Sequence, residues 1–309
     1  MSLVRLGSRG SALALWQAER VRSLLAARGI SSEITVIRTS GDEGSARPAA
    51  YVEGKGLFTR ELEDALLDGR IDAAVHSAKD LGALVPGGLV LAAFPEREDA
   101  RDAVVSRAGS GLAGLGAGMR IGTASLRRIS ALRAERPDLA IVPIRGNVPT
   151  RLARIEKGEV DAVMLAMAGL KRLDLAAHAV PLDPSVFVPA PAQGALAIET
   201  REDDAATRGA IAQLDDAKTR ISVEAERAAM AELEGGCRVP LGITTLGEPG
   251  AQYLLLRVYA TDGTRTLTAK AELDPRDPRG SGLKAARELL AKGARDLIAD
   301  QRLEAMEEK

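Results

Sequence analysis

The stretch Ile71-Asp72-Ala73-Ala74-Val75-His76-Ser77-Ala78-Lys79-Asp80 decides the fold. Its first half is small and β-branched, as in a buried strand, and Gly69 marks the end of a preceding helix. Its second half is polar, so we expect His76, Ser77, Lys79 and Asp80 just beyond the carboxyl end of that strand. Ligands bind at this edge of open α/β sheets, because its loops escape the helices that cover both faces. The pattern predicts a catalytic or binding element; a solvated turn is the alternative.

Length and composition limit the class of protein. A chain of 309 residues predicts two or three domains, and 46% hydrophobic with 28% charged residues is typical of globular proteins. A strand that starts at Leu3 leaves no room for a signal peptide, and the single cysteine fits a reducing cytoplasm. A net charge of −1 offers no general attraction to nucleic acid or membranes. We therefore expect a cytoplasmic protein with neither as a partner.

Two segments of the chain resemble each other in order and composition. LGSRGS at 6–11 and IGTASL at 121–126 both lead from a strand into a helix, and LDGRIDAAV at 67–75 resembles IEKGEVDAV at 155–163. Two similarly wired α/β lobes with a cleft between them are the economical interpretation, and chance similarity is the alternative. A strand at 195–199 is expected to return to the first lobe, which gives two crossings and a hinge.

The pattern changes after Asp216. One helix ends at Gly235-Gly236, a hairpin turns at Asp262-Gly263, and a final helix follows, as in a small α+β domain. The predicted fold class is thus α/β: two similarly wired lobes, periplasmic-binding-protein-like of type II, plus a small C-terminal α+β domain. We expect residues 1–95 and 196–214 in the first lobe, 100–190 in the second and 216–309 in the third domain.

Arginines are concentrated between Arg120 and Arg154, where only two acidic residues, Glu135 and Asp138, accompany the cluster. The planar guanidinium fork matches carboxylate and phosphate oxygens, and helix starts supply N–H groups for anions. Such helix starts combine arginines with hydroxyl or turn residues in three places, which together predict a polyanionic ligand, phosphate or polycarboxylate. The residues are Thr123, Ser125, Arg127 and Arg128; Arg145 and Arg151; and Arg9 with Ser11.

The remaining arginines of this stretch, Arg133, Arg136 and Arg154, fit a solvated helix face instead. No Walker pattern, dinucleotide fingerprint, paired histidine ligands or Ser-His-Asp signature is convincing. Nucleotide and metal sites are therefore not expected.

Cys237 is the second focus. A lone cysteine is usually a buried small hydrophobe, but Gly235-Gly236 before it and Arg238-Val239-Pro240 after it disfavour burial in regular structure. Arg238 favours the thiolate, whereas the end of the preceding helix opposes it. An exposed thiol in such a loop could carry a covalent group, and with no histidine nearby in sequence a protease-like pair is not supported.

Several motifs, in order from residue 3 to about 245, resemble those of the porphobilinogen deaminase (hydroxymethylbilane synthase) family. They are SRGSALALWQ at 8–17, GKGLF at 54–58, HSAKD at 76–80, GTASLRR at 122–128, RGNV at 145–148, TRL at 150–152, AGLKRL at 168–173 and LEGGC at 233–237. The resemblance implies a transferase that adds four porphobilinogen units to a dipyrromethane cofactor and releases linear hydroxymethylbilane. It implies a thioether from that cofactor to Cys237, and a monomer.

The resemblance also implies roles for single residues. Asp80 is implied as the catalytic carboxylate beside the pyrrole nitrogens. Cofactor binding is assigned to Lys79, Asp80, Thr123, Ser125, Arg127, Arg128, Arg151 and Gly146, besides Cys237. The incoming substrate or growing chain is assigned to Arg9, Ser11, Arg145, Arg172, Gln193 and Lys55.

The chain departs from the family pattern at four positions. Ala78 replaces a larger apolar residue, Ala124 a serine, Ala192 a glycine and Arg60 a lysine, and none removes a charge that the chemistry needs. A non-catalytic, two-lobed carboxylate- or anion-binding protein is the main alternative, and a phosphoribosyl-type transferase is a second one.

Replacing the solitary cysteine tests the attachment. Cys237→Ser should leave the fold intact but remove the covalent adduct and nearly all activity, because a hydroxyl is a far weaker nucleophile than a thiolate. Mass spectrometry of the denatured protein measures the adduct directly. An unchanged adduct in Cys237→Ser would refute the assignment.

Overall fold

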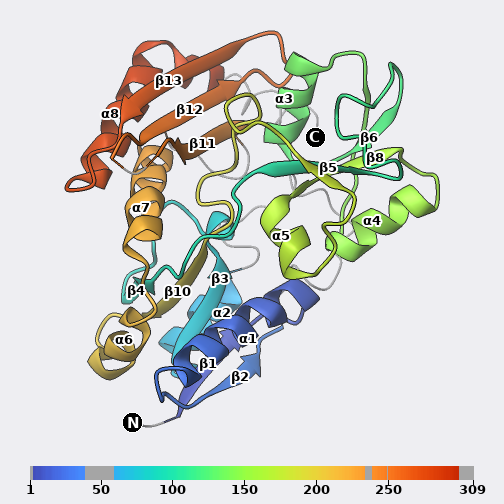
Figure 1. The fold of residues 1–309 in the computed structure, drawn as a ribbon. Helices are drawn as coiled ribbons and strands as arrows, with labels where there is room; N and C mark the ends of the chain where they lie inside the picture. Colours follow the sequence, from blue (N-terminus) through green and yellow to red (C-terminus); the bar gives the residue numbers. More distant parts are fainter. Residues whose placement is uncertain (1–2, 39–58, 234–238, 249, 299–309) are drawn as a thin grey trace. The chain divides into compact units, whose positions relative to one another are not determined.

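The computed structural model of the chain describes residues 3–38, 59–233, 239–248 and 250–298 (Figure 1). The predictions for Lys55 and for Cys237 lie outside the described residues. The chain forms two compact units: Met1–Glu98 with Gly194–Arg220, and Asp99–Gln193 with Ile221–Lys309. The boundaries of three domains stay a prediction.

The first unit contains a five-stranded sheet in the order β2-β1-β3-β10-β4. The first three of these strands are parallel, whereas β10 runs antiparallel to both of its neighbours. The strands are β1 (Val4–Ser8), β2 (Ser32–Val36), β3 (Ala73–Ser77), β4 (Leu89–Ala93) and β10 (Leu196–Arg201). The helices are α1 (Ala12–Ala26), α2 (Arg60–Leu67) and α6 (Ala205–Ala212).

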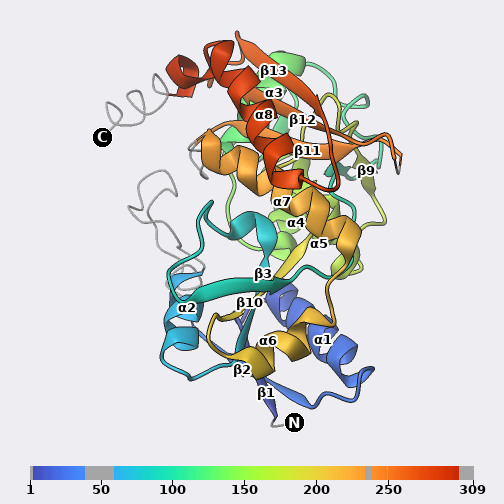
Figure 2. The same cartoon turned by 90° about the vertical axis from the view of Figure 1, so that its left-hand side faces the viewer.

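Helices cover both faces of this sheet. Successive side chains of a strand point to opposite faces, so Ala73 and Val75 pack with α1 and α6, while Ala74 packs with α2. Figure 2 shows α1 and α6 on one side of the sheet and α2 on the other. Strands buried on both faces explain the uninterrupted apolar pattern that predicted them.

The second unit contains a sheet of the same design, in the order β7-β6-β8-β5-β9. Its strands are β5 (Asp102–Ser106), β6 (Arg120–Gly122), β7 (Ala140–Val142), β8 (Ala162–Ala166) and β9 (Ala179–Pro181). Its helices are α3 (Leu126–Glu135), α4 (Val148–Glu156) and α5 (Met167–Arg172). In each sheet the fourth strand is the antiparallel one, which confirms the predicted pair of similarly wired lobes.

Two matching ion pairs show how closely the lobes repeat each other. Asp72 accepts hydrogen bonds from the main-chain N–H and the guanidinium of Arg5, at 2.9 Å and 2.7 Å. Asp161 accepts the same two bonds from Arg120, at 2.7 Å and 2.9 Å. Each pair connects an arginine near the start of one strand, β1 or β6, with the aspartate that directly precedes the neighbouring strand, β3 or β8. The hydrogen bond from Arg5 lowers the pKa of Asp72 to about 2.

The rest of the second unit is a small α+β layer, as predicted. Strands β11 (Leu241–Leu246), β12 (Tyr253–Tyr259) and β13 (Thr266–Glu272) form an antiparallel sheet. Alternate residues Leu254, Leu256 and Val258 point to one face and pack with α7 (Ala217–Glu232) and α8 (Pro278–Ala291). One covered face is the expected arrangement for such a domain.

Ala192, one of the departures from the family pattern, has a left-handed backbone with φ of 58°. Its N–H donates to Oε2 of Glu226 on α7 at 2.7 Å, and Oε1 of the same buried carboxylate accepts from the N–H of Thr245 at 2.9 Å. Glu226 thus fixes the turn at 190–193 against β11. This contact compensates for a conformation that favours glycine.

One sequence prediction needs correction, and some short elements were not predicted. The strand of the opening stretch begins at Ala73 rather than Ile71, so His76 and Ser77 belong to it and only the short 3-10 helix η1 (Ala78–Asp80) lies beyond it. Helices α5 and α6 were not predicted from the sequence. Both are short, with six and eight residues, so periodicity alone carries little signal for them.

A pair of helix glycines tests how closely α7 and α8 pack. A Cβ at Gly282 in α8 would collide with the main-chain oxygen of Ala225, whereas a Cβ at Gly209 in α6 would meet nothing within 4 Å. Gly282→Ala should therefore lose about 1–3 kcal/mol of unfolding free energy through overpacking. Gly209→Ala should gain up to about 1 kcal/mol from helix propensity. Denaturant unfolding measures both, and equal effects would contradict the close crossing.

Candidate active site

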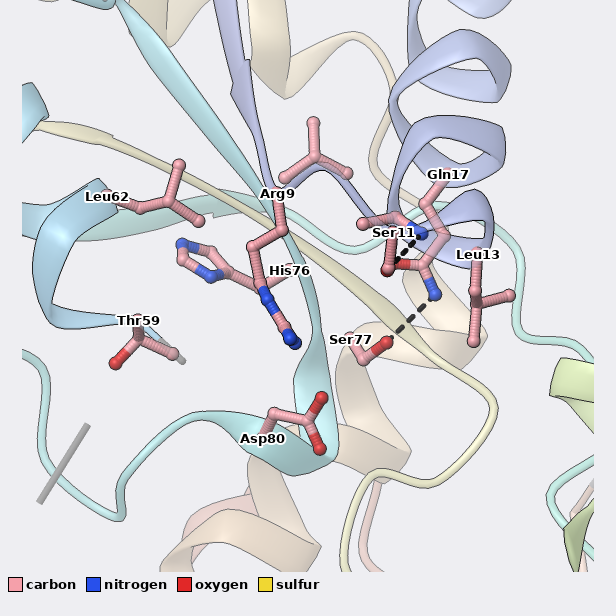
Figure 3. A pocket seen from close by; sticks show the side chains of 11 residues that line it. Arg9, Ser11, Leu13, Gln17, Thr59, Leu62, His76, Ser77 and Asp80 are labelled. Carbon is pink, nitrogen blue, oxygen red and sulfur yellow. Dashed lines mark hydrogen bonds between the residues drawn. The ribbon is translucent and has the colours of Figure 1, made fainter. Parts of the chain in front are cut away.

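A pocket in the first unit gathers polar side chains at the carboxyl end of β1 and β3 (Figure 3). Parallel neighbouring strands end at the same edge of a sheet, and Gly7 of β1 is in register with Ala74 of β3. The polar residues that line the pocket are Arg9 and Ser11 after β1, Gln17 on α1, Thr59 before α2, His76 and Ser77 on β3, and Asp80 in η1.

Several of these side chains are held in place by their neighbours. The Ser11 hydroxyl caps α1 by accepting from the N–H of Ala14, and Gln17 donates to the Ser77 hydroxyl at 2.8 Å. In Figure 3 the guanidinium of Arg9 points toward the carboxylate of Asp80. Asp80 is half-buried, and η1 also carries Lys79. The pocket thus brings together Arg9, Ser11 and Asp80, three of the predicted site residues.

The second unit holds the two arginines that follow the start of α3, and both point into the protein. Arg127 and Arg128 are each only 5% exposed, and both bind the fully buried carboxylate of Asp102. The shortest N–O distances are 2.6 Å from Arg127 and 2.8 Å from Arg128. Each guanidinium also donates to a main-chain oxygen, that of Val188 at 2.9 Å and that of Met164 at 3.0 Å.

Gln193 joins the same network. Its Nε2 donates to Asp102 at 2.9 Å and to the main-chain oxygen of Ala100 at 2.8 Å, and its side chain is buried. Gln193 was predicted at the substrate. Within the described residues its amide supports Asp102, and its role at the substrate stays a prediction.

Electrostatics leave this network with an excess of positive charge. Burial opposes the ionisation of Asp102, but the two guanidiniums outweigh it and hold the pKa of that carboxyl well below its usual range. Burial likewise lowers the pKa of Arg128. Two cations share one anion, and each guanidinium has five N–H donors for the three hydrogen bonds it makes. The excess positive charge and the spare donors fit an anionic ligand.

The other predicted binding residues lie around two loops of this unit. Thr123 is buried and its hydroxyl accepts from the N–H of Ser125, which begins α3 without a side-chain cap. Arg151 donates to the main-chain oxygen of Gly146 at 2.7 Å, and Gly146 has a left-handed φ of 107°. Arg145 is exposed and Arg172, at the end of α5, is buried. Their binding roles stay predictions.

Sequence reasoning missed two acidic residues, Asp102 and Glu199. Asp102 starts an apolar strand and lies 25 residues before Arg127, while Glu199 lies 123 residues after its partner, His76. A carboxylate within an otherwise apolar strand is the only local signal for either. In the described part of the chain, no cluster of three or more His, Cys, Asp or Glu could hold a metal. There too, no helix combines the length and apolarity that crossing a membrane requires.

The fold and the site define a class of protein. It is a two-lobed α/β protein with two buried arginines around the carboxylate of Asp102 and, in the other lobe, a pocket lined by Arg9 and Asp80. Residues 4–209 match the family model "Porphobilinogen deaminase, dipyromethane cofactor binding domain", and residues 220–291 match "Porphobilinogen deaminase, C-terminal domain". The chain belongs to the porphobilinogen deaminase family.

Individual relatives agree with this assignment. Porphobilinogen deaminase of Syntrophobacter fumaroxidans is 44% identical over 96% of this chain and 97% of its own length. That of Nocardia farcinica is 47% identical over 96% of this chain and 88% of its own. Among solved structures, a periplasmic substrate-binding protein of an ABC transporter from Coxiella burnetii aligns with 68% of this chain and 91% of its own, with 16% identity and a TM-score of 0.40.

Removing the charge of Asp102 tests the buried network. Asp102→Asn should cost about 3–5 kcal/mol of unfolding free energy, because it leaves two buried cations without their counter-charge. Asp138→Asn is the control, since Asp138 pairs with Arg136 at the surface, where ion pairs contribute little. Thermal and denaturant unfolding at neutral pH measure both variants.

Because Asp102 is ionised in the folded protein, we also expect the unfolding free energy to depend on pH. The folded-state pKa of Asp102 is lowered, so its stabilising contribution is present above the ordinary carboxyl pKa of 3.8 and is lost as the pH falls toward the lowered value. The stability difference between wild type and Asp102→Asn should therefore shrink below about pH 4. A difference that grows on acidification would contradict an ionised Asp102.

Proposed function

We propose that the chain is a hydroxymethylbilane synthase, which deaminates four porphobilinogen units, joins them head to tail on a dipyrromethane cofactor and releases linear hydroxymethylbilane. Family membership supports this activity. The observation that carries it at the level of residues is the pocket in which Arg9 and Asp80 face each other at the end of β3. A cation and a carboxylate placed together suit a substrate that carries both carboxylates and an amine.

Each joining step has a simple balance. The C–N bond of one aminomethyl group and a C–H bond of the acceptor ring break, a C–C bond forms, and ammonia leaves. Positive charge develops as the amine departs, and the carboxylate of Asp80 would stabilise it. Asp80 would also help remove the proton from the reacting ring carbon.

The buried network of the second unit supports the cofactor assignment. Acetate and propionate side arms would be bound by the excess positive charge of Arg127 and Arg128 around Asp102. We assign Lys79, Thr123, Ser125, Arg151 and Gly146 to the same cofactor, and Cys237 to its thioether. When bound, the cofactor supplies the ring carbon to which the first substrate is joined.

Substrate binding is assigned to Arg9, Ser11, Arg145 and Arg172. Arg9 and Ser11 line the pocket with Asp80, which supports their assignment. Gln193 and Lys55 are also assigned to the substrate. Gln193 would act by holding Asp102 and, through it, the two arginines.

We further propose that the enzyme is a cytoplasmic monomer and works without a nucleic acid or membrane partner. The single cysteine fits a reducing compartment, and a net charge of −1 gives no general attraction to polyanions. Size-exclusion chromatography with light scattering measures the oligomeric state.

Two substitutions at Asp80 test the function. Asp80→Asn keeps the size of the side chain but removes its charge, so product formation from porphobilinogen should fall about 10²–10³-fold. Asp80→Glu keeps the charge but moves it by one methylene, so it should retain more activity than Asp80→Asn. Steady-state and single-turnover assays measure both.

Mass spectrometry completes this test by detecting the adduct on Cys237. Wild type should carry two extra pyrrole units, which a non-catalytic anion-binding protein would lack. If Asp80→Asn matches wild type, or is faster than Asp80→Glu, Asp80 is not the catalytic carboxylate. If wild type neither carries the adduct nor forms product, the function itself is wrong.

A further inference from the structure

His76, one of the residues that line the pocket, belongs to a buried pair of ionisable side chains. Nε2 of His76 lies 3.1 Å from Oε2 of Glu199, and the two side chains are 3% and 0% exposed. They lie on adjacent antiparallel strands, because Ala197 of β10 is in register with His76 of β3. Among the described residues, Oε1 of Glu199 has no hydrogen-bond partner.

This pair is costly as a purely structural contact. Burying a carboxylate with an unsatisfied oxygen costs more than one hydrogen bond returns, and two apolar residues would join the strands at less cost. The second lobe shows this, since β5 and β8 meet through apolar residues such as Val105 and Val163 at the centre of its sheet. The first lobe retains an imidazole and a carboxylate at an equivalent depth.

The imidazole also belongs to the pocket. His76 lines it together with Arg9 and Asp80, and in Figure 3 its ring lies beside Arg9 on the side of Leu62. With Nε2 engaged by Glu199, Nδ1 is the ring nitrogen left for the pocket. A carboxylate that binds one ring nitrogen fixes the tautomer and stabilises the imidazolium when the other nitrogen takes a proton.

The charged groups around the ring come from four elements. They are Glu199 on β10, Glu63 on α2, Arg9 after β1 and Asp80 in η1. Burial chiefly raises the pKa of Glu63, the negative charge of Glu199 adds to this, and the hydrogen bond from Thr59 and the charge of His76 oppose it.

We propose, on the basis of the function proposed above, that His76 and Glu199 form a proton-holding pair for the joining step. The C–N bond breaks first, and the amine, an ammonium at neutral pH, leaves as ammonia. The C–C bond then forms, and the ring carbon loses one proton, which Asp80 helps to remove. Nδ1 of His76 accepts that proton and holds it until it is released to water before the next unit reacts. Glu199 is the positioning residue, because it orients the ring and balances the imidazolium charge.

A double amide substitution separates proton holding from cross-strand bonding. In His76→Gln/Glu199→Gln the two amides can still hydrogen-bond across the strands, but neither can hold a proton. The unfolding midpoint should stay close to that of wild type, while the single-turnover rate should fall about 10²-fold. The pH profile of the rate should also lose one titrating group.

Single substitutions and a control complete the series. Glu199→Gln keeps the size and an acceptor oxygen, and its rate should fall at least about 10-fold with the fold intact. Thr200→Val is the matched control, because Thr200 follows Glu199 on β10 and its buried hydroxyl has no partner among the described residues. Its rate should equal that of wild type.

A spectroscopic measurement does not depend on activity. The chain has only two histidines, and His178 is exposed, so ¹⁵N-histidine NMR shows two imidazoles that a His178→Gln spectrum assigns. When its ring is neutral, His76 should carry its proton on Nε2 and leave Nδ1 bare. A proton on Nδ1 overturns the proposal.

The reaction rates provide a second, independent test. A double amide variant that recovers wild-type stability, rate and pH profile together shows that the pair only joins the strands, which overturns the proposal. That result leaves the proposed function untouched, because wild type still forms product in the same assay. If the double variant does not fold, the rate of Glu199→Gln and the NMR tautomer decide.

Discussion

The second unit depends on one carboxylate shared by two guanidiniums. Asp102 is fully buried at the start of β5, and it binds two successive residues of α3, Arg127 and Arg128. None of the three charges could be buried alone, because the desolvation penalty of each amounts to several kcal/mol. Together they fix the start of α3 on the sheet and, through Val188 and Gln193, the returning segment. The arrangement leaves one positive charge in excess, and this excess supports the proposed binding of an anionic cofactor.

The two lobes share their wiring but use it for different chemistry. Both sheets have the same arrangement of parallel and antiparallel strands, and matching Arg–Asp pairs connect the second and third strands across each sheet. In the second lobe two buried cations surround Asp102. In the first lobe Asp80 lines a pocket together with His76, which pairs with Glu199. The scaffold fixes where functional groups emerge, and the residues at a few strand ends and helix starts decide what they do.

The sequence predicted the features that depend on neighbouring residues. Buried strands, the helix cap at Ser11 and the repeated order of elements follow from local periodicity and hydroxyl placement, and the structure confirms them. It could not predict that Arg127 and Arg128 turn inward. Only two acids accompany them nearby in the chain, so the sequence predicted an anionic ligand as their partner and gave no sign of Asp102. The partner of the two arginines, Asp102, lies on strand β5. The partner of His76, Glu199, lies on strand β10, 123 residues later in the chain. Such pairings are fixed by tertiary structure, which local patterns do not encode.

The turn at Ala192 has an evolutionary consequence. Its left-handed backbone disfavours a side chain by roughly 1–2 kcal/mol, and the buried Glu226 holds it by accepting its N–H. With glycine at this position the carboxylate is needed only at the N–H of Thr245, whereas with alanine it is needed at both contacts. Residues 192 and 226 should therefore covary among relatives, with alanine accompanied by glutamate more often than chance allows. The order of substitution matters as well: the acid has to be in place before the methyl group can be accepted.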